Sequence, residues 1–150
     1  MLREFLQLNP VLLSALISWT IAQALKVVIH FLQSSEWNWA LLFRAGGMPS
    51  SHSAMVSAAA HAIGLFLGFS KPLFGLAVVF ALIVIYDATG IRRQAGKQAA
   101  LLNSMIEDIS RGKLAQQRKL REVLGHTPGE AITGMMLGIF LAQVVWWIGG

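Results

Sequence analysis

Four stretches of the chain carry almost no charge and are long enough to cross a lipid bilayer as helices. A hydrocarbon core about 30 Å thick needs roughly 20 apolar residues in helical conformation. Stretches close to that length occupy residues 11–32, 53–69, 72–88 and 131–148. This pattern predicts an all-α fold, in which residues 1–150 form a single domain built as an integral membrane bundle of about four transmembrane helices.

The first stretch could also be the apolar part of a cleaved signal peptide. Ala22-Gln23-Ala24 has the small-x-small form of a cleavage site. However, Arg3 is offset by Glu4 in the leader, and the apolar run continues well past the site. These features favour a retained span.

Composition agrees with a chain that faces lipid. Charged residues make up 13% of the sequence and apolar residues 55%, whereas about 25% of a typical soluble domain is charged. The chain has no cysteine, which excludes disulfides, a thiol nucleophile and thiolate-bound metal centres.

The distribution of positive charge predicts the orientation. Four spans place residues 33–52 and 87–130 on one side, and this side carries nearly all the basic residues: Arg44, Arg92, Arg93, Lys97, Arg111, Lys113, Arg118, Lys119 and Arg121. The opposite side holds Arg3 and Lys71. The positive-inside rule makes the rich side cytoplasmic, in a cell inner membrane of the bacterial type. The net charge of +5 indicates contact with an anionic lipid surface. Nucleic acid is not an expected partner, because the basic residues are not interleaved with aromatic stacking platforms.

Rows of small and polar residues run along the spans. They are Ser14, Ser18, Ala22, Lys26 and His30; Ser53, Ser57 and His61; Gly64 with Gly68; and Gly134 with Gly138. Small residues at this spacing let helices approach closely in lipid, so we interpret most of them as packing positions.

A first candidate site lies where a loop becomes the second span, in Gly46-Gly47-Met48-Pro49-Ser50-Ser51-His52-Ser53. The unpaired N–H groups of a helix start, beside serine hydroxyls, favour anion binding. His52 would lie over that site. The alternative is an ordinary capped helix start with an interfacial histidine.

A second segment, Gly125-His126-Thr127-Pro128-Gly129-Glu130, leads into the fourth span on the same side. If the turn is helical, His126 and Glu130 share a face and can hydrogen-bond. A carboxylate on one imidazole nitrogen fixes the tautomer and raises the basicity of the other nitrogen, as a histidine nucleophile requires.

Basic residues offer further phosphate ligands. Arg92 and Arg93 follow Asp87 and a glycine turn, an arrangement that suits fork-shaped recognition of phosphate but also a stop-transfer cluster. Lys26 lies inside a span, where a cation usually faces a cavity or partner; snorkelling is the alternative. We expect His30 and His61 to hydrogen-bond within the bundle, since the histidine spacings fit no common metal-ligand pattern.

Three motifs together, GGMPSSHSA, YDATGIRRQAGKQA and LGHTPGEAITG, resemble the divergent branch of the type 2 phosphatidic acid phosphatase family, whose members are described as acid phosphatase/vanadium-dependent haloperoxidase-related proteins. The similarity covers nearly the whole chain. It implies a metal-independent phosphatase without a cofactor, whose phosphate pocket accepts vanadate.

The resemblance also implies roles for individual residues. His126 would attack phosphorus, His52 would protonate the leaving oxygen, and Glu130 would replace the orienting Asp. The substrate-binding residues would be Lys26, Gly47, Ser50, Ser51, Asp87, Arg92, Arg93 and Arg121. This sequence has PSSH where the wider family has PSGH, and Arg121 precedes His126 by five residues where the family has six.

The expected reaction is hydrolysis of a phosphomonoester on a membrane phospholipid, such as a phosphatidylglycerophosphate- or phosphatidate-like lipid, at the cytoplasmic face. A non-catalytic lipid-phosphate-binding protein is one alternative. A CDP-alcohol phosphotransferase-like enzyme is another, although that chemistry needs several aspartates around a metal and the chain has only Asp87 and Asp108. A second copy of the chain is a further candidate partner, in a homo-oligomer.

The segment between the third and fourth spans, residues 98–124, alternates leucines with basic residues. This pattern is typical of one or two interfacial amphipathic helices on anionic lipid. A lid over the site is the alternative.

Overall fold

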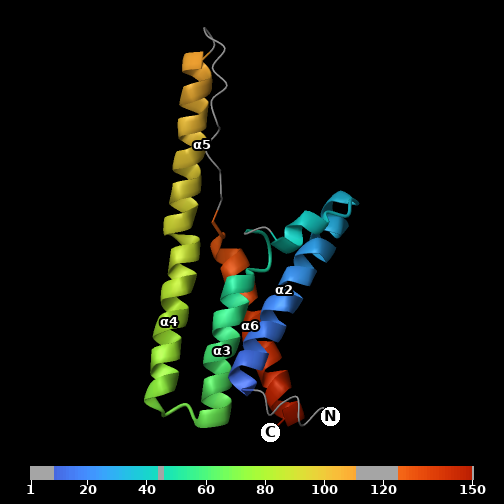
Figure 1. The fold of residues 1–150 in the computed structure, drawn as a ribbon, viewed down its shortest axis with the longest axis vertical. Coiled ribbons are helices and arrows are strands. Elements are labelled where there is room, and N and C mark those ends of the chain that lie inside the picture. Colours follow the sequence, from blue (N-terminus) through green and yellow to red (C-terminus); the bar gives the residue numbers. More distant parts are fainter. Residues whose placement is uncertain (1–8, 44–45, 111–124, 150) are drawn as a thin grey trace.

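The computed structural model describes residues 9–43, 46–110 and 125–149 (Figure 1). Its helices are α2 (Pro10–Ser34), the short 3₁₀ helix η1 (Trp39–Phe43), α3 (Ser51–Leu67), α4 (Pro72–Thr89), α5 (Ile91–Ser110) and α6 (Pro128–Gly149). Helices α2 and α4 run in one direction through the bundle, and α3 and α6 run in the other (Figure 1). The starts of α3 and α6 therefore lie at the same end as the end of α4.

The all-α membrane bundle predicted from the sequence is confirmed. Three segments of the described chain are long and apolar enough to cross a membrane: Pro10–Ser34, Pro72–Ile106 and Pro128–Gly149. The fourth, α3, is a shorter apolar helix of 17 residues. It begins two residues before the expected position because Ser50 caps it, and it ends at Gly68, whose φ of 109° stops the helix. This central helix packs against α2, α4 and α6.

The bundle buries small and polar side chains and exposes large apolar ones. Ser14, Ser18, Ala22 and Lys26 are all buried along one face of α2, as their spacing predicted. Outward-facing side chains on α4 are large and apolar: Leu73, Leu76, Val79, Phe80, Leu82 and Ile83. This arrangement suits a lipid environment, because lipid tails are as apolar as leucine side chains and burying those side chains gains little. Contacts between helices then depend on close packing of small residues.

The tightest helix contact joins α6 to α3. A Cβ atom added at Gly134 would overlap the carbonyl oxygen of Ser50, and one added at Gly138 would overlap that of Ala54. The backbones of the two helices therefore touch, which confirms the packing role predicted for this glycine pair. Gly64 and Gly68 differ from our expectation: Gly64 accommodates the ring of Phe69, beyond the end of its own helix, and Gly68 forms the helix end.

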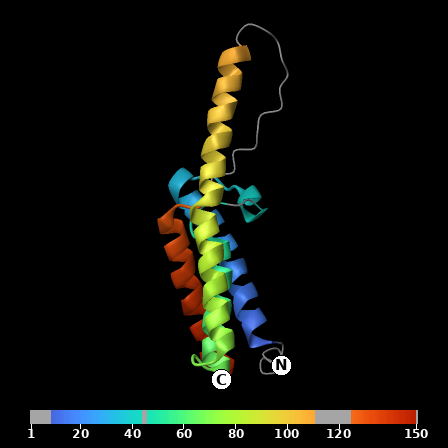
Figure 2. The ribbon, with the colours of Figure 1, turned by 90° about the vertical axis from the view of Figure 1, so that its left-hand side faces the viewer.

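Helix α5 continues the direction of α4 beyond the ends of the other helices (Figures 1 and 2). Helical hydrogen bonds pass through the junction, from the Gly90 N–H to the Tyr86 oxygen (2.8 Å) and from the Gln94 N–H to the Gly90 oxygen (3.0 Å). The predicted amphipathic segment is therefore helical up to Ser110, although α5 does not turn across the bundle axis as an interfacial helix would. Residues 111–124 of that segment lie outside the described residues.

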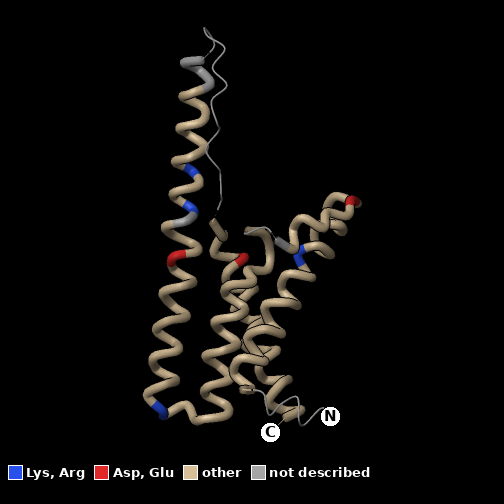
Figure 3. Tube along the Cα trace, viewed as in Figure 1, with Lys and Arg blue, Asp and Glu red and all other residues tan. Residues whose placement is uncertain are grey.

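Charged positions of the described chain gather toward the end of the bundle where α3 and α6 begin (Figure 3). Lys71 lies at the opposite end, as the residue that precedes α4. The fold thus separates one charged end from a nearly uncharged body.

Candidate functional site

The loop before α3 ends in a buried serine cap. The Ser50 hydroxyl oxygen accepts hydrogen bonds from the Ser53 N–H (3.3 Å) and from the Ser53 hydroxyl (2.9 Å). Gly46 and Gly47 precede it with φ values of 97° and 83°, which residues with a side chain rarely adopt. The predicted helix start is confirmed, and its cap removes one N–H group from those that could bind an anion.

The start of α6 is built around Glu130. Its Oε2 atom accepts the Thr127 N–H (3.1 Å), while the Glu130 N–H donates to the Thr127 hydroxyl oxygen (3.3 Å). This reciprocal arrangement is a capping box. The same Oε2 atom lies 3.1 Å from Nδ1 of His126. The predicted pairing of His126 with Glu130 is confirmed. His126 lies before the first residue of α6, so the two side chains are brought together by the capping box and not by a helical turn.

The Glu130 contact defines the chemistry of the imidazole. A carboxylate oxygen accepts hydrogen bonds, so the contact favours the tautomer in which the Nδ1–H of His126 donates a hydrogen bond to Glu130. Nε2 then carries the lone pair of the neutral ring. The ring is almost fully buried, with His126 only 5% exposed. A histidine nucleophile needs the lone pair that this tautomer leaves on Nε2.

Backbone hydrogen bonds join three helices at this point. The Ser50 N–H donates to the Glu130 carbonyl oxygen (2.9 Å), and the His126 N–H donates to the Ala88 carbonyl oxygen (2.9 Å). The first bond locks the start of α3 to the start of α6, and the second holds the residue before α6 against the end of α4. His126 is therefore fixed by its backbone as well as by its ring.

Lys26 reaches this end of the bundle from α2. Its Nζ atom donates to the Ser51 hydroxyl oxygen at 3.2 Å, and the residue is only 4% exposed. The Glu130 carboxylate interacts electrostatically with this ammonium group, and Gly47 lies beside its aliphatic stem. Snorkelling to water does not account for so buried a cation. The lysine instead provides positive charge at the junction of the two helix starts.

The remaining predicted site residues lie on α3, α4 and α5 or outside the described residues. His52 is the second residue of α3 and half-buried, so it belongs to the helix turn whose cap is bonded to Glu130. Asp87 and Arg93 lie on α4 and α5, and Arg92 belongs to the first turn of α5. Arg121 lies outside the described residues. Phosphate contact by these residues and acid catalysis by His52 stay predictions.

Two contributors to the site were missed by sequence reasoning. Thr127 closes the capping box that orients Glu130, and the carbonyl group of Ala88 holds the His126 backbone. The T-x-x-E spacing from Thr127 to Glu130 was a usable signal for the first. A backbone carbonyl leaves no such signal in a sequence.

His61 lies outside this cluster, as its spacing suggested. Its Nε2 atom lies 3.2 Å from Oε1 of Gln143, so it links α3 to α6 within the bundle. The expected hydrogen bond inside the bundle is confirmed for this histidine.

These features define a helical membrane protein with a buried histidine–carboxylate pair where two packed helices begin. Residues 7–141 match the model of the Divergent PAP2 family, and the chain belongs to that family. The uncharacterized membrane protein YuiD of Bacillus subtilis (strain 168) is 40% identical over 148 residues, which cover 91% of this chain and 94% of that relative. No solved structure matches the chain at a significant level.

Proposed function

We propose that this protein is a metal-independent phosphatase that hydrolyses a lipid-linked phosphomonoester through a phosphohistidine intermediate. The observation that carries the proposal is the hydrogen bond between His126 Nδ1 and Glu130 Oε2. Because this bond leaves the lone pair on Nε2, the buried ring is prepared for attack on phosphorus. Membership in the Divergent PAP2 family supports the same chemistry.

In the first step, Nε2 of His126 attacks phosphorus and the bond between phosphorus and the ester oxygen breaks. His52 donates a proton to the departing oxygen, which leaves as the alcohol of the lipid. The positive charge that develops on the His126 ring is stabilised by the Glu130 carboxylate. The phosphoryl group is now bound to Nε2.

In the second step, water attacks the phosphohistidine while His52, now neutral, accepts a proton from it. The bond between phosphorus and Nε2 breaks, inorganic phosphate leaves, and both histidines return to their starting states. Each step uses one proton transfer and no metal. Vanadate would bind in place of phosphate as a mimic of the five-coordinate transition state.

The phosphoryl oxygens need positive charge and donors close to Nε2. Lys26 and Ser51 lie together at the start of α3, and the N–H groups of the first turn after Ser50 add the positive end of a helix dipole. Arg92, Arg93 and Arg121 are the guanidinium groups proposed to complete the cradle. The phosphate would thus be held between α2, α3 and α6.

The proposed substrate is a phospholipid in the cytoplasmic leaflet, of phosphatidylglycerophosphate- or phosphatidate-like type. In the topology expected from the sequence, most basic residues lie on the side of the membrane where α3 and α6 begin, and the positive-inside rule supports a cytoplasmic position for that side. A lipid that reaches the site from the leaflet would keep its acyl chains in the membrane.

The test is phosphate release by the purified protein in lipid vesicles that contain one phosphomonoester lipid at a time, with EDTA present throughout. We expect steady release from at least one lipid of the phosphatidate or phosphatidylglycerophosphate type, with the same rate after magnesium is added. Vanadate should inhibit competitively. Vanadate binding without release from any lipid would favour a non-catalytic phosphate-binding protein, and absolute dependence on magnesium would contradict the proposed mechanism.

A further inference from the structure

Gln23 has a buried side-chain amide of which only one end is hydrogen-bonded. Its Nε2 atom donates to the Leu42 carbonyl oxygen at 2.8 Å, and this bond ties α2 to η1. The residue is only 9% exposed, and no donor among the described residues reaches its Oε1 atom. The Leu42 carbonyl oxygen can only accept, so the amide cannot turn over without losing that bond. The orientation of Oε1 is therefore fixed, and this acceptor is open.

An open acceptor in so buried a position is unusual, because leaving a buried polar atom without a partner costs stability. Ser18 is the other described residue with a buried side-chain oxygen that has no partner. A serine hydroxyl can turn to donate to the carbonyl oxygen one helical turn back, as Ser14 does to Pro10 at 2.8 Å. Oε1 of Gln23 needs a donor instead, and the N–H groups of a helix interior are already used. A bound molecule can supply that donor.

Gln23 lies next to the proposed phosphate cradle. It precedes Lys26 by three residues, so the two side chains are neighbours on the buried face of α2. The rise between them is about 4.5 Å along the helix, and Gln23 is the one farther from the charged end of the bundle. Lys26 in turn donates to Ser51 at the start of α3. A lipid whose phosphate lies at Lys26 would place the next atoms of its head group toward the membrane, at the level of Gln23.

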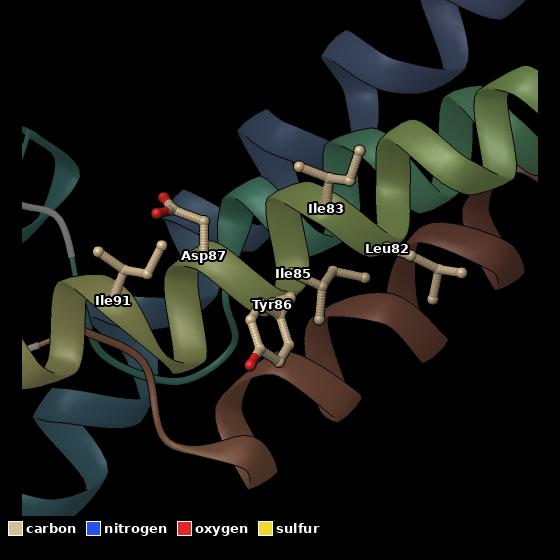
Figure 4. A pocket seen from close by; sticks show the side chains of 6 residues that line it. All are labelled: Leu82, Ile83, Ile85, Tyr86, Asp87 and Ile91. Carbon is tan, nitrogen blue, oxygen red and sulfur yellow. The ribbon is translucent and has the colours of Figure 1, made fainter.

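Acceptors on α4 suit contact with a phosphorylated head group less well. Tyr86 and Asp87 line a hollow on the outer surface of that helix, and their side chains point to different sides (Figure 4). Tyr86 is 74% exposed, and a carboxylate such as that of Asp87 repels a phosphate of the same sign. The neutral amide of Gln23 can accept a hydroxyl group beside a phosphate without that repulsion.

We propose that Oε1 of Gln23 accepts a hydrogen bond from a hydroxyl group next to the phosphomonoester of the lipid, which makes Gln23 a specificity-determining residue. The inference rests on the proposed function and deepens it, because it selects one class of head group. Phosphatidylglycerophosphate has a hydroxyl on the carbon beside the phosphate-bearing carbon, whereas the head of phosphatidate has none. The glycerol phosphate head is therefore the expected one of the two.

The first test combines one change in the protein with one change in the substrate. Dioleoyl phosphatidylglycerophosphate is compared with its deoxy analogue, in which propane-1,3-diol replaces the glycerol of the head group. We expect wild type to favour the hydroxyl-bearing lipid about tenfold in kcat/KM, the effect of one hydrogen bond. Gln23→Met removes both polar ends of the side chain at nearly constant size, and it should bring this ratio close to one. A ratio that Gln23→Met leaves unchanged, whatever the loss in absolute rate, would overturn the proposal, because the bond to Leu42 affects both lipids equally.

The matched control is Ser18→Ala, which removes the other open oxygen buried on α2. Ser18 lies farther from Lys26 along the helix, so the ratio of kcat/KM for the two lipids should stay at the wild-type value. A fall in the ratio as large as that in Gln23→Met would show that the preference depends on the packing of α2 in general, and it would contradict the assignment to Oε1.

A second measurement needs no turnover. The His126→Ala variant is unfolded by heat in detergent with each of the two lipids in turn, since a ligand that binds the folded state raises Tm. We expect the larger rise with the hydroxyl-bearing lipid, and Gln23→Met in the same background should remove the difference. Equal rises in the His126→Ala variant would overturn the inference. A larger rise with the hydroxyl-bearing lipid, in a protein whose wild type releases no phosphate, would refute the phosphatase while retaining the hydroxyl contact.

Discussion

We expect His126→Ala to abolish phosphate release from the proposed lipid substrate, with a loss of about a thousandfold or more. The substitution removes the proposed nucleophilic atom, Nε2, together with the ring that Glu130 orients. Losses of this size follow removal of a nucleophile. Release of phosphate from vesicles, measured with EDTA present, checks the result.

Two further variants distinguish a loss of catalysis from a loss of folding. Glu130→Gln keeps a side-chain oxygen that can accept a hydrogen bond from Nδ1 of His126, but it removes the negative charge that would stabilise the positively charged ring. Its activity should therefore fall between those of wild type and His126→Ala. His61→Ala removes a histidine that joins the same two helices outside the site, and it should retain activity. Full activity in His126→Ala, or loss of activity in His61→Ala equal to that in His126→Ala, would contradict the assignment.

Gly134→Ala both destabilises the bundle and impairs the site. The added methyl group would overlap the Ser50 carbonyl oxygen, and pushing the two backbones apart would strain the Ser50–Glu130 hydrogen bond beside it. Overpacking of this kind costs about 3 kcal/mol, which corresponds to a fall in Tm of roughly 6–12 °C for a chain of this size. Thermal unfolding in detergent, followed by tryptophan fluorescence, measures the shift.

The matched control is Gly75→Ala, because a Cβ atom at Gly75 meets nothing within 4 Å. It should leave both Tm and phosphate release close to wild type. Gly138→Ala overlaps the Ala54 carbonyl oxygen one turn farther from the site, so it should lower Tm as much as Gly134→Ala does while affecting activity less. An unchanged Tm in Gly134→Ala would show that α3 and α6 do not touch as described.

The fold could be predicted from the sequence because lipid imposes a simple rule on length and charge. Uncharged stretches near 20 residues gave the helices, and the i, i+4 row through Ser14, Ser18 and Lys26 correctly marked the buried face of α2. Helix ends were predicted less well. The start of α3 depends on which serine hydroxyl caps it, and the hydrophobicity of the sequence does not indicate which serine that is.

The site was predictable where the chemistry is local. His126 and Glu130 lie four residues apart, so their contact could be anticipated, and the charge of Lys26 inside a span marked it as unusual. The contacts that join separate helices, from Ser50 to Glu130 and from His126 to Ala88, use backbone atoms that every residue has. Only the three-dimensional arrangement reveals them.

The central claim is that phosphate is transferred to Nε2 of His126, and trapping the intermediate tests it most directly. The protein is mixed with a ³²P-labelled lipid phosphomonoester, quenched with alkali within a turnover and digested. We predict label on the peptide that contains His126, stable in alkali and lost in acid, and absent from His126→Ala. Steady release of phosphate with no label on His126, or with label on another residue, would contradict the account.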